Sequence, residues 1–126
     1  MTKVNCFEDL DIWKKSIELS LSIYEITSRD KIKTDFGLKD QMQRASVSIS
    51  SNIAEGFEYN NNKQFIRFLY YAKGSLGELR SQLFLLEKLE IISTKESNHL
   101  INICKQLSSM IYKFIKYLSE YKTENK

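Results

Sequence analysis

The residues best suited to metal chemistry are Glu96 and His99, which have the Glu-x-x-His spacing found in di-iron four-helix bundles. Such a site needs a second motif of the same kind, but His99 is the only histidine in the chain. Glu96 also falls where a helix is expected to begin, whereas di-iron ligands project from the middle of helices. We therefore expect His99 to be a surface residue, and we expect no metal, no cofactor and no catalytic site of the Ser-His-Asp or Cys-His kind.

The segment Gly74-Ser75-Leu76-Gly77 contains closely spaced glycines but does not fit a phosphate-binding loop. It lies inside a predicted helix and lacks the preceding strand and the following lysine of a P-loop. Each glycine destabilises a helix interior by about 0.8 to 1 kcal/mol relative to alanine. Close backbone approach would explain both, either to another helix of the same chain or to a second subunit.

Polar residues at helical spacing form two lines beside the apolar positions. The first line is Gln41, Arg44, Ser48, Asn52 and Glu55, and the second is Tyr71, Ser75, Glu78 and Gln82. A charge beside the core is destabilising unless it is paired, so we expect Arg44 to form an ion pair with Glu78 or Glu55. Catalytic roles for Glu55 and Glu78 would require a pocket and raised pKa values, and structural pairing is favoured.

A third pattern is basic. The net charge is +3, and it is unevenly spread: residues 1–28 carry −2 and residues 93–126 carry +3. Four lysines fall within about 80° of one another on the last predicted helix. They are Lys95, Lys105, Lys113 and Lys116. This face could bind phosphates, but composition alone favours a solvated face that confers solubility.

The elements that must position these residues are helices. The chain has no proline and only four glycines, and strand-like alternation is nowhere sustained. We predict helices over about 9–28, 36–57, 62–89 and 94–121. Asp35, the asparagines at 60–62 and a capping box of Ser93 and Glu96 are the expected helix starts.

Each predicted helix has an apolar line that should face the core. The first helix has two such lines: Leu10, Trp13, Ile17, Leu21 and Tyr24, then Ile12, Leu19, Ile23 and Ile26. The second helix has Leu38, Met42, Ala45, Ile49 and Ile53. The third has Phe65, Leu69, Ala72, Leu76, Leu79, Leu83 and Leu86, and the fourth has Leu100, Cys104, Leu107, Ile111, Phe114, Leu118 and Tyr121. These spacings and the short second and third connections predict an all-α, antiparallel, up-down-up-down four-helix bundle.

Length and composition set the remaining expectations. A chain of 126 residues with 42% hydrophobic residues predicts one domain over 1–126. Cys6 and Cys104 are far apart and are expected to be reduced, with Cys104 in the core. No apolar run is long enough to span a membrane and the first residues do not resemble a secretory signal, so we expect a cytoplasmic protein.

Three motifs resemble those of the 23S ribosomal RNA intervening-sequence protein family, also called the four helix bundle protein family. They are Phe7-Glu8-Asp9-Leu10-Asp11-Ile12-Trp13, the stretch from Arg44 to Gly56 (RASVSISSNIAEG), and Phe68-Leu69 with Ala72-Lys73-Gly74-Ser75-Leu76-Gly77-Glu78-Leu79. Ser50 departs from the family pattern, which often has proline there, and this leaves the second helix less bent or less sharply defined.

The resemblance implies a ring assembly, typically a homopentamer, and no catalytic residues. The bundle is also similar to the accessory protein of diversity-generating retroelements, which associates with a reverse transcriptase and nucleic acid. Arg44, Asn52, Glu55, Ser75 and Glu78 match the polar network of the family. Two hypotheses follow: an oligomeric module that binds RNA or a ribonucleoprotein, or an adaptor that binds a protein partner. A small-molecule substrate is not expected, and an enzyme is the least favoured class.

Overall fold

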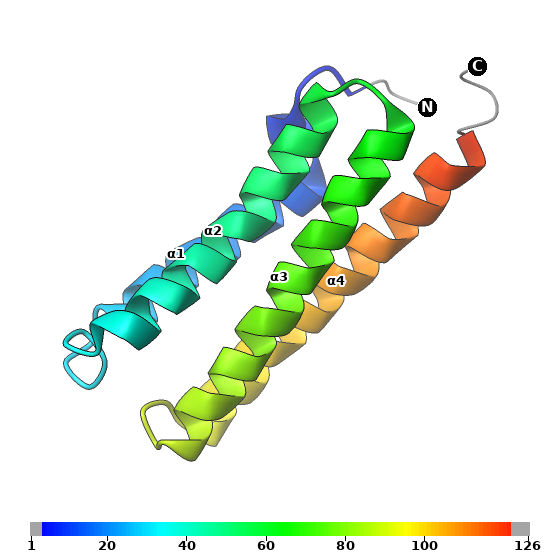
Figure 1. Ribbon diagram of the computed structural model, residues 1–126. Coiled ribbons are helices and arrows are strands. Elements are labelled where there is room, and N and C mark those ends of the chain that lie inside the picture. Colours follow the sequence, from blue (N-terminus) through cyan, green and yellow to red (C-terminus); the bar gives the residue numbers. More distant parts are fainter. Residues whose placement is uncertain (1–3, 122–126) are drawn as a thin grey trace.

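The computed structural model describes residues 4–121 and shows four long helices after a short 3-10 helix. They are η1 (Phe7–Asp9), α1 (Asp11–Thr27), α2 (Phe36–Glu58), α3 (Asn62–Lys88) and α4 (Thr94–Tyr121). Successive helices run in opposite directions, and the α2–α3 connection lies at the opposite end of the bundle from the other two connections (Figure 1). Each helix packs on two neighbours, and α1 and α4 make the least extensive contact. The predicted all-α, up-down-up-down bundle is confirmed.

The predicted starts of α2, α3 and α4 are confirmed, whereas α1 begins at Asp11 instead of near Asp9 because Phe7–Asp9 form η1. Asp35 caps α2 by accepting a hydrogen bond from Leu38 N (3.1 Å), and Asn61 caps α3 by accepting one from Gln64 N (3.1 Å). Asn60 has a φ of 51°, which asparagine tolerates better than most residues. Residues 1–3 and 122–126 of the expected 1–126 domain lie outside the described part.

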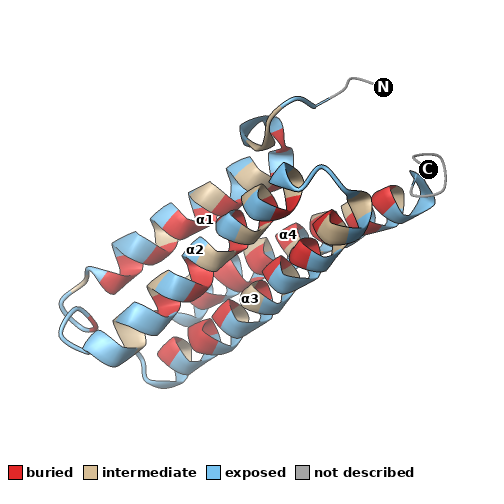
Figure 2. Ribbon diagram, turned by 45° about the horizontal axis from the view of Figure 1, so that its top comes forward, coloured by how far each residue is buried: buried red, intermediate tan, exposed pale blue. Residues whose placement is uncertain are grey.

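The core is a single cluster between the four helices, with buried residues on their inner faces (Figure 2). All positions of the predicted α3 line are buried: Phe65, Leu69, Ala72, Leu76, Leu79, Leu83 and Leu86. In α2, Met42, Ala45, Ile49 and Ile53 are buried and Leu38 is half-buried. Ile32 closes the α1–α2 end of the core although it lies in a connection. The α2 and α3 lines are therefore confirmed.

The apolar faces of α1 and α4 differ in part from the prediction. Of the two α1 lines, that of Ile12, Leu19, Ile23 and Ile26 is buried, while Trp13 and Ile17 of the other are half-buried. Leu10, which directly precedes α1, is also buried. Leu21 is 67% exposed and Tyr24 is 46% exposed, so their placement in the core was wrong. Ser16 is buried in their stead and donates to the Trp13 carbonyl at 2.7 Å. Because this bond satisfies the serine within its own helix, a small polar residue can lie on the inner face.

The last turns of α4 also differ from the predicted apolar line. Leu100, Cys104, Leu107, Ile111 and Leu118 are buried as predicted, but Phe114 is half-buried and Tyr121 is 40% exposed. Ile101 and Ile115 complete the inner face. The predicted line assumed a strict repeat of 3.5 residues. The buried surface of α4 is a wider apolar stripe, which includes residues beside that line.

A glycine is needed for close helix packing at Gly56, but not at Gly74 and Gly77, where the sequence had indicated it. A Cβ on Gly56 would lie 2.7 Å from Phe68 Cβ and 3.0 Å from Phe65 Cδ1. At Gly74 and Gly77 a Cβ would meet no atom within 4 Å. Of the two explanations left open for Gly74 and Gly77, close packing against another helix of this chain is therefore wrong. They lie on the outer face of α3.

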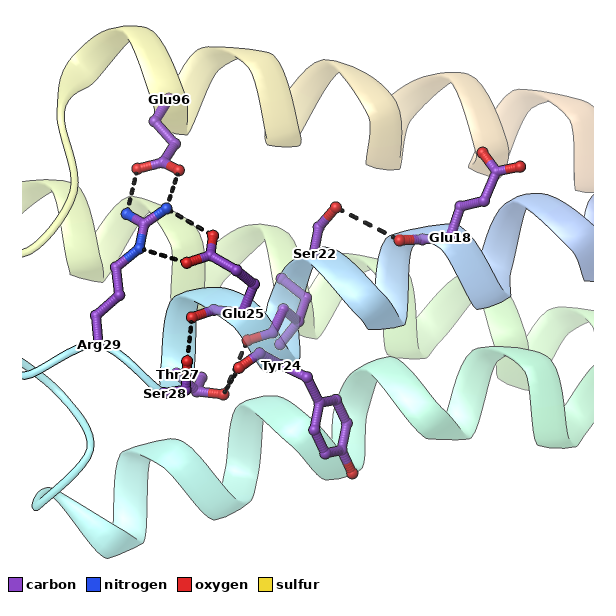
Figure 3. Close-up of polar contacts among 9 residues, drawn as sticks. Glu18, Ser22, Tyr24, Glu25, Thr27, Ser28, Arg29 and Glu96 are labelled. Carbon is purple, nitrogen blue, oxygen red and sulfur yellow. Dashed lines mark hydrogen bonds and ion pairs between the residues drawn. The ribbon is translucent and has the colours of Figure 1, made fainter.

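An ion-pair cluster joins the end of α1 to the start of α4 (Figure 3). The Arg29 guanidinium donates to Glu96 from Nη1 (2.8 Å) and Nη2 (2.7 Å), and to Glu25 from Nε (3.1 Å) and Nη2 (2.7 Å). The Ser93 hydroxyl accepts from Glu96 N at 3.0 Å, so this half of the predicted capping box is confirmed. The Glu96 carboxylate binds Arg29 instead of completing the box, because a charged two-point contact is stronger than a bond to a neutral N–H.

We predict opposite effects of alanine at Gly56 and at Gly74. Gly56→Ala should destabilise the protein by about 1–3 kcal/mol, because Phe68 Cβ belongs to the α3 frame and cannot move without shifting the helix. Gly74→Ala should stabilise it by up to about 1 kcal/mol, since the new methyl group meets no neighbour and alanine favours helix. Urea unfolding measures both, at one protein concentration low enough to keep the subunits apart. Equal effects at the two positions would contradict the packing at Gly56.

We also predict an acid-sensitive contribution from Glu96. The hydrogen bonds from Arg29 lower the pKa values of Glu96 and Glu25 below the ordinary 4.5. A lowered pKa in the folded state stabilises the fold above pH 4.5, and this contribution is lost as the pH falls through the lowered value. Glu96→Gln should therefore cost up to about 1 kcal/mol at pH 7. The difference from the wild type should shrink below pH 4.5.

The control for this prediction is Glu58→Gln, which changes an exposed glutamate that forms none of the described ion pairs. Its stability should follow that of the wild type at every pH. A Glu96→Gln deficit that persists at low pH would assign the effect to packing and contradict the ionic contribution.

Candidate nucleic-acid interface

The lysine face of α4 consists of Lys95, Lys105, Lys113 and Lys116, and all four side chains are exposed. At 1.5 Å of rise per residue, the successive lysines are about 15, 12 and 4.5 Å apart along the helix. Within residues 4–121 no ion pair joins any of these ammonium groups to a carboxylate. Between Glu96 and Glu120 the helix has no acidic residue. The middle of this face, from Lys105 to Lys116, is therefore positively charged, and acidic residues occur only at its two ends.

A groove of about 540 Å³ lies between α1 and α4 beside this face. Its apolar part is formed by Leu19, Ile103, Leu107 and Met110. Lys15 of α1 and Lys113 of α4 both line it, with Glu18 as its acidic residue. The fold thus adds Lys15 to the basic surface. Sequence analysis missed this residue because it belongs to a segment with a net negative charge and lies far from α4 in the chain.

The same inter-helix groove continues past Ser22 into a second hollow. Glu25, Glu96 and His99 line this part, together with Leu21, Ile26 and Leu100. Glu25 and Glu96 are held by Arg29 (Figure 3). The groove therefore has a basic end at Lys15 and Lys113 and a carboxylate-lined end at the Arg29 cluster, and a polyanion would favour the basic end.

The polar network predicted on α2 and α3 forms in part. Ser75 Oγ donates to Ser48 Oγ at 2.9 Å, and Asn52 Nδ2 donates to the Ser48 carbonyl (2.8 Å) and hydroxyl (3.0 Å). Asn52 and Ser75 are thus linked through Ser48, and all three residues are half-buried. The Ser75–Ser48 bond joins α3 to α2, the two helices with the most extensive contact in the bundle, and the Asn52 bonds lie within α2.

The charged members of that network lie apart from this link. The expected ion pair of Arg44 with Glu78 or Glu55 is not formed: Arg44 lies 3.9 Å from Asp40, with both side chains mostly exposed. Glu55 is exposed, and Glu78 accepts a hydrogen bond from Gln82 Nε2 at 3.5 Å. The pairing was predicted from the cost of burying a charge, and exposure removes that cost.

The groups that could do thiol or metal chemistry are unsuited to it. His99 is exposed, as expected, and the described residues contain no cluster of three or more His, Cys, Asp or Glu side chains that could hold a metal ion. Both cysteines are free, and Cys104 is buried as predicted. Burial raises the pKa of Cys104 to about 12, and a hydrogen bond to Asp9 raises the pKa of Cys6 to about 11. Little of either thiol is ionised near neutral pH.

Residues 8–113 match the family model described as "23S rRNA-intervening sequence protein". Among solved structures, the chain is similar to a protein of unknown function from the S23 ribosomal protein family of Bacteroides thetaiotaomicron. The two are 24% identical with a TM-score of 0.75, and the match covers 83% of this chain and 98% of the other. That likeness shows the shared fold. No curated protein matches the chain.

None of the helices in residues 4–121 is long and apolar enough to cross a membrane.

Proposed function

This chain belongs to the 23S rRNA-intervening sequence protein family, and on that premise we propose that it is a non-enzymatic cytoplasmic protein that binds RNA or a ribonucleoprotein. The lysine face of α4 is the proposed contact. The observation that supports it most directly is the outer side of α4, where Lys105, Lys113 and Lys116 are exposed and no acidic residue lies between Lys105 and Lys116. Lys15 extends this charge across the groove, so a phosphate backbone lying along α4 would meet lysines from two helices.

We also propose that the protein assembles as a homo-oligomer, as the family resemblance implies for a pentameric ring. Gly74 and Gly77 leave the outer face of α3 flat, and Tyr70 and Phe84 on that helix are 50% and 46% exposed. A second subunit packed there would explain two glycines that no contact within the chain explains. Assembly would multiply a weak lysine contact, because each copy presents the same face.

An adaptor that binds a protein is the second candidate. Phe36 and Leu21 are 74% and 67% exposed, and each offers apolar area that a protein surface could cover. Protein binding of this kind would depend little on salt, whereas binding to phosphates weakens steeply with it. The salt dependence therefore separates the two candidates.

We predict that exchanging Lys105, Lys113 and Lys116 for glutamate strongly weakens RNA binding. The probe is a labelled, mixed-sequence, single-stranded RNA titrated at several salt concentrations. Loss of three phosphate contacts should weaken binding more than tenfold at low salt and lower the salt slope by about 2. Binding unchanged in this variant would contradict the proposed face.

The matched control exchanges Lys31, Lys39 and Lys88 for glutamate, which gives the same net charge from positions outside α4. If the α4 lysines act by position, the control should retain most of the affinity. If both variants lose affinity equally, total charge alone drives the interaction and the face is not specific.

We predict that Gly74→Leu disrupts the assembly without unfolding the subunit. Leucine has room in the single chain, where no atom lies within 4 Å of the Cβ position, but it would clash with a subunit packed closely on α3. Light scattering coupled to size-exclusion chromatography measures the mass, and circular dichroism checks the helix content. A monomeric wild type, or an assembly unchanged by Gly74→Leu, would contradict subunit packing at this position.

A further inference from the structure

A cluster of aromatic rings lies where α2 ends and α3 begins, on helices other than the one that carries the lysine face. Tyr59 follows the last residue of α2, and its ring stacks on Phe68 with a centroid distance of 5.3 Å and an interplanar angle of 19°. Tyr71 meets Phe68 edge-on at 5.5 Å. Phe68 is 8% exposed, whereas Tyr59 is 53% exposed. Since one face of Tyr59 covers Phe68, its exposed area is largely the opposite face and the ring edge.

The position of the Tyr59–Phe68 ring pair is fixed by close helix packing and by the turn after Tyr59. Gly56 leaves no room for a Cβ beneath Phe68, so α3 packs closely on α2 at this point. The turn after Tyr59 is held by a hydrogen bond from Asn60 N to the Phe57 carbonyl (3.2 Å) and by the Asn61 cap. Tyr59 is therefore presented by a rigid connection and would lose little freedom when a ligand stacks on it.

Arg67 places a positive charge beside the rings. Its guanidinium lies 5.7 Å from the centroids of both Phe68 and Tyr71, and its Nε donates to the Tyr71 hydroxyl at 2.9 Å. Nη1 donates to Gln64 Oε1 at 3.3 Å. In residues 4–121 no carboxylate forms an ion pair with Arg67. The guanidinium is thus oriented by neutral partners and keeps its charge for an anion.

Two carboxylates complete the surroundings. Glu55 and Glu58 line a shallow pocket of about 210 Å³ together with Tyr59. A carboxylate repels phosphate but accepts hydrogen bonds from the exocyclic amino groups of nucleobases, as in its contact with cytosine N4. The carboxylates thus suit the amino group on the edge of a base, and the exposed face of Tyr59 suits its plane. Arg67 suits the phosphate of the same nucleotide.

We propose that Tyr59, Arg67, Glu55 and Glu58 form a binding site for one unpaired, amino-bearing base of single-stranded RNA. The base stacks on the free face of Tyr59, its amino group donates to Glu55 or Glu58, and Arg67 binds the adjacent phosphate. Uracil has no amino group to donate and should bind more weakly. This inference rests on the proposed RNA-binding function and adds a contact that reads the base, which the lysine face cannot do.

The test compares single-stranded oligonucleotides of adenylate, cytidylate and uridylate. The wild type should bind the adenylate and cytidylate chains more tightly than the uridylate chain. Tyr59→Ala should weaken the first two at least fivefold, because stacking on an aromatic ring contributes strongly to the binding of each base. Tyr59→Phe keeps the ring and should retain the affinity. Equal binding of the three chains by the wild type, or no effect of Tyr59→Ala, would overturn the proposal.

Two further variants separate the parts of the site. Glu55→Gln with Glu58→Gln should reduce the preference over uridylate, since an amide can also donate to the uracil carbonyl. Arg67→Gln should lower the salt slope by about 1 while the base preference remains. If the carboxylate variant keeps the full preference, the base is not read by these residues.

The outcomes also distinguish this proposal from the one on which it rests. If the lysine variant weakens binding while Tyr59→Ala and the choice of base have no effect, RNA binding stands and the base site is wrong. If no oligonucleotide binds at all, both proposals fail. A protein whose capture depends on Tyr59, without any oligonucleotide binding, would make the cluster a protein contact and overturn its assignment to RNA.

Discussion

The burial of the α3 seam is the constraint on which the rest of the structure depends. Leu69, Leu76, Leu79 and Leu83 are fully buried, and α3 makes the two most extensive helix contacts in the bundle, with α2 and with α4. These contacts fix α2 and α4 on either side of α3. α1 then packs on α2, and its contact with α4 is the least extensive of the four. The groove that holds Lys15 and Lys113 is the consequence of this uneven packing.

Much of this fold could be predicted from the sequence because its signals are local. The α3 line has an unbroken spacing of leucines and small residues, and Asp35 and Asn61 act within one helical turn. The inner face of α1 could not be predicted, since Leu21 and Tyr24 are as apolar as the residues that are buried. Its orientation depends on small residues such as Ser16, whose burial is stabilised by a bond to its own backbone.

The candidate site shows the same division between local and non-local information. The lysine face could be predicted because one helix carries it at a fixed angular spacing. Lys15 could not, and neither could the partner of Glu96, because each contact joins elements far apart in the chain. The Arg44 ion pair was predicted from a rule for buried charges, and it failed because helix rotation leaves Arg44 in solvent. Gly56 belongs to one of the family motifs, but its role in the close packing of α2 on α3 depends on Phe65 and Phe68, which lie on another helix.

The Arg29 cluster has a consequence for how the bundle folds. It joins residues 67 positions apart in the chain, whereas the α2–α3 and α3–α4 contacts join consecutive helices through short connections. Closing a long loop loses more chain entropy than closing a hairpin, so we expect the three later helices to associate first and α1 to dock on α4 last. On unfolding, the contact between α1 and α4 should accordingly be the first to break. The contact between α1 and α4 is then the one that opens most readily in the native protein. The ion pair of Arg29 with Glu96 opposes this opening.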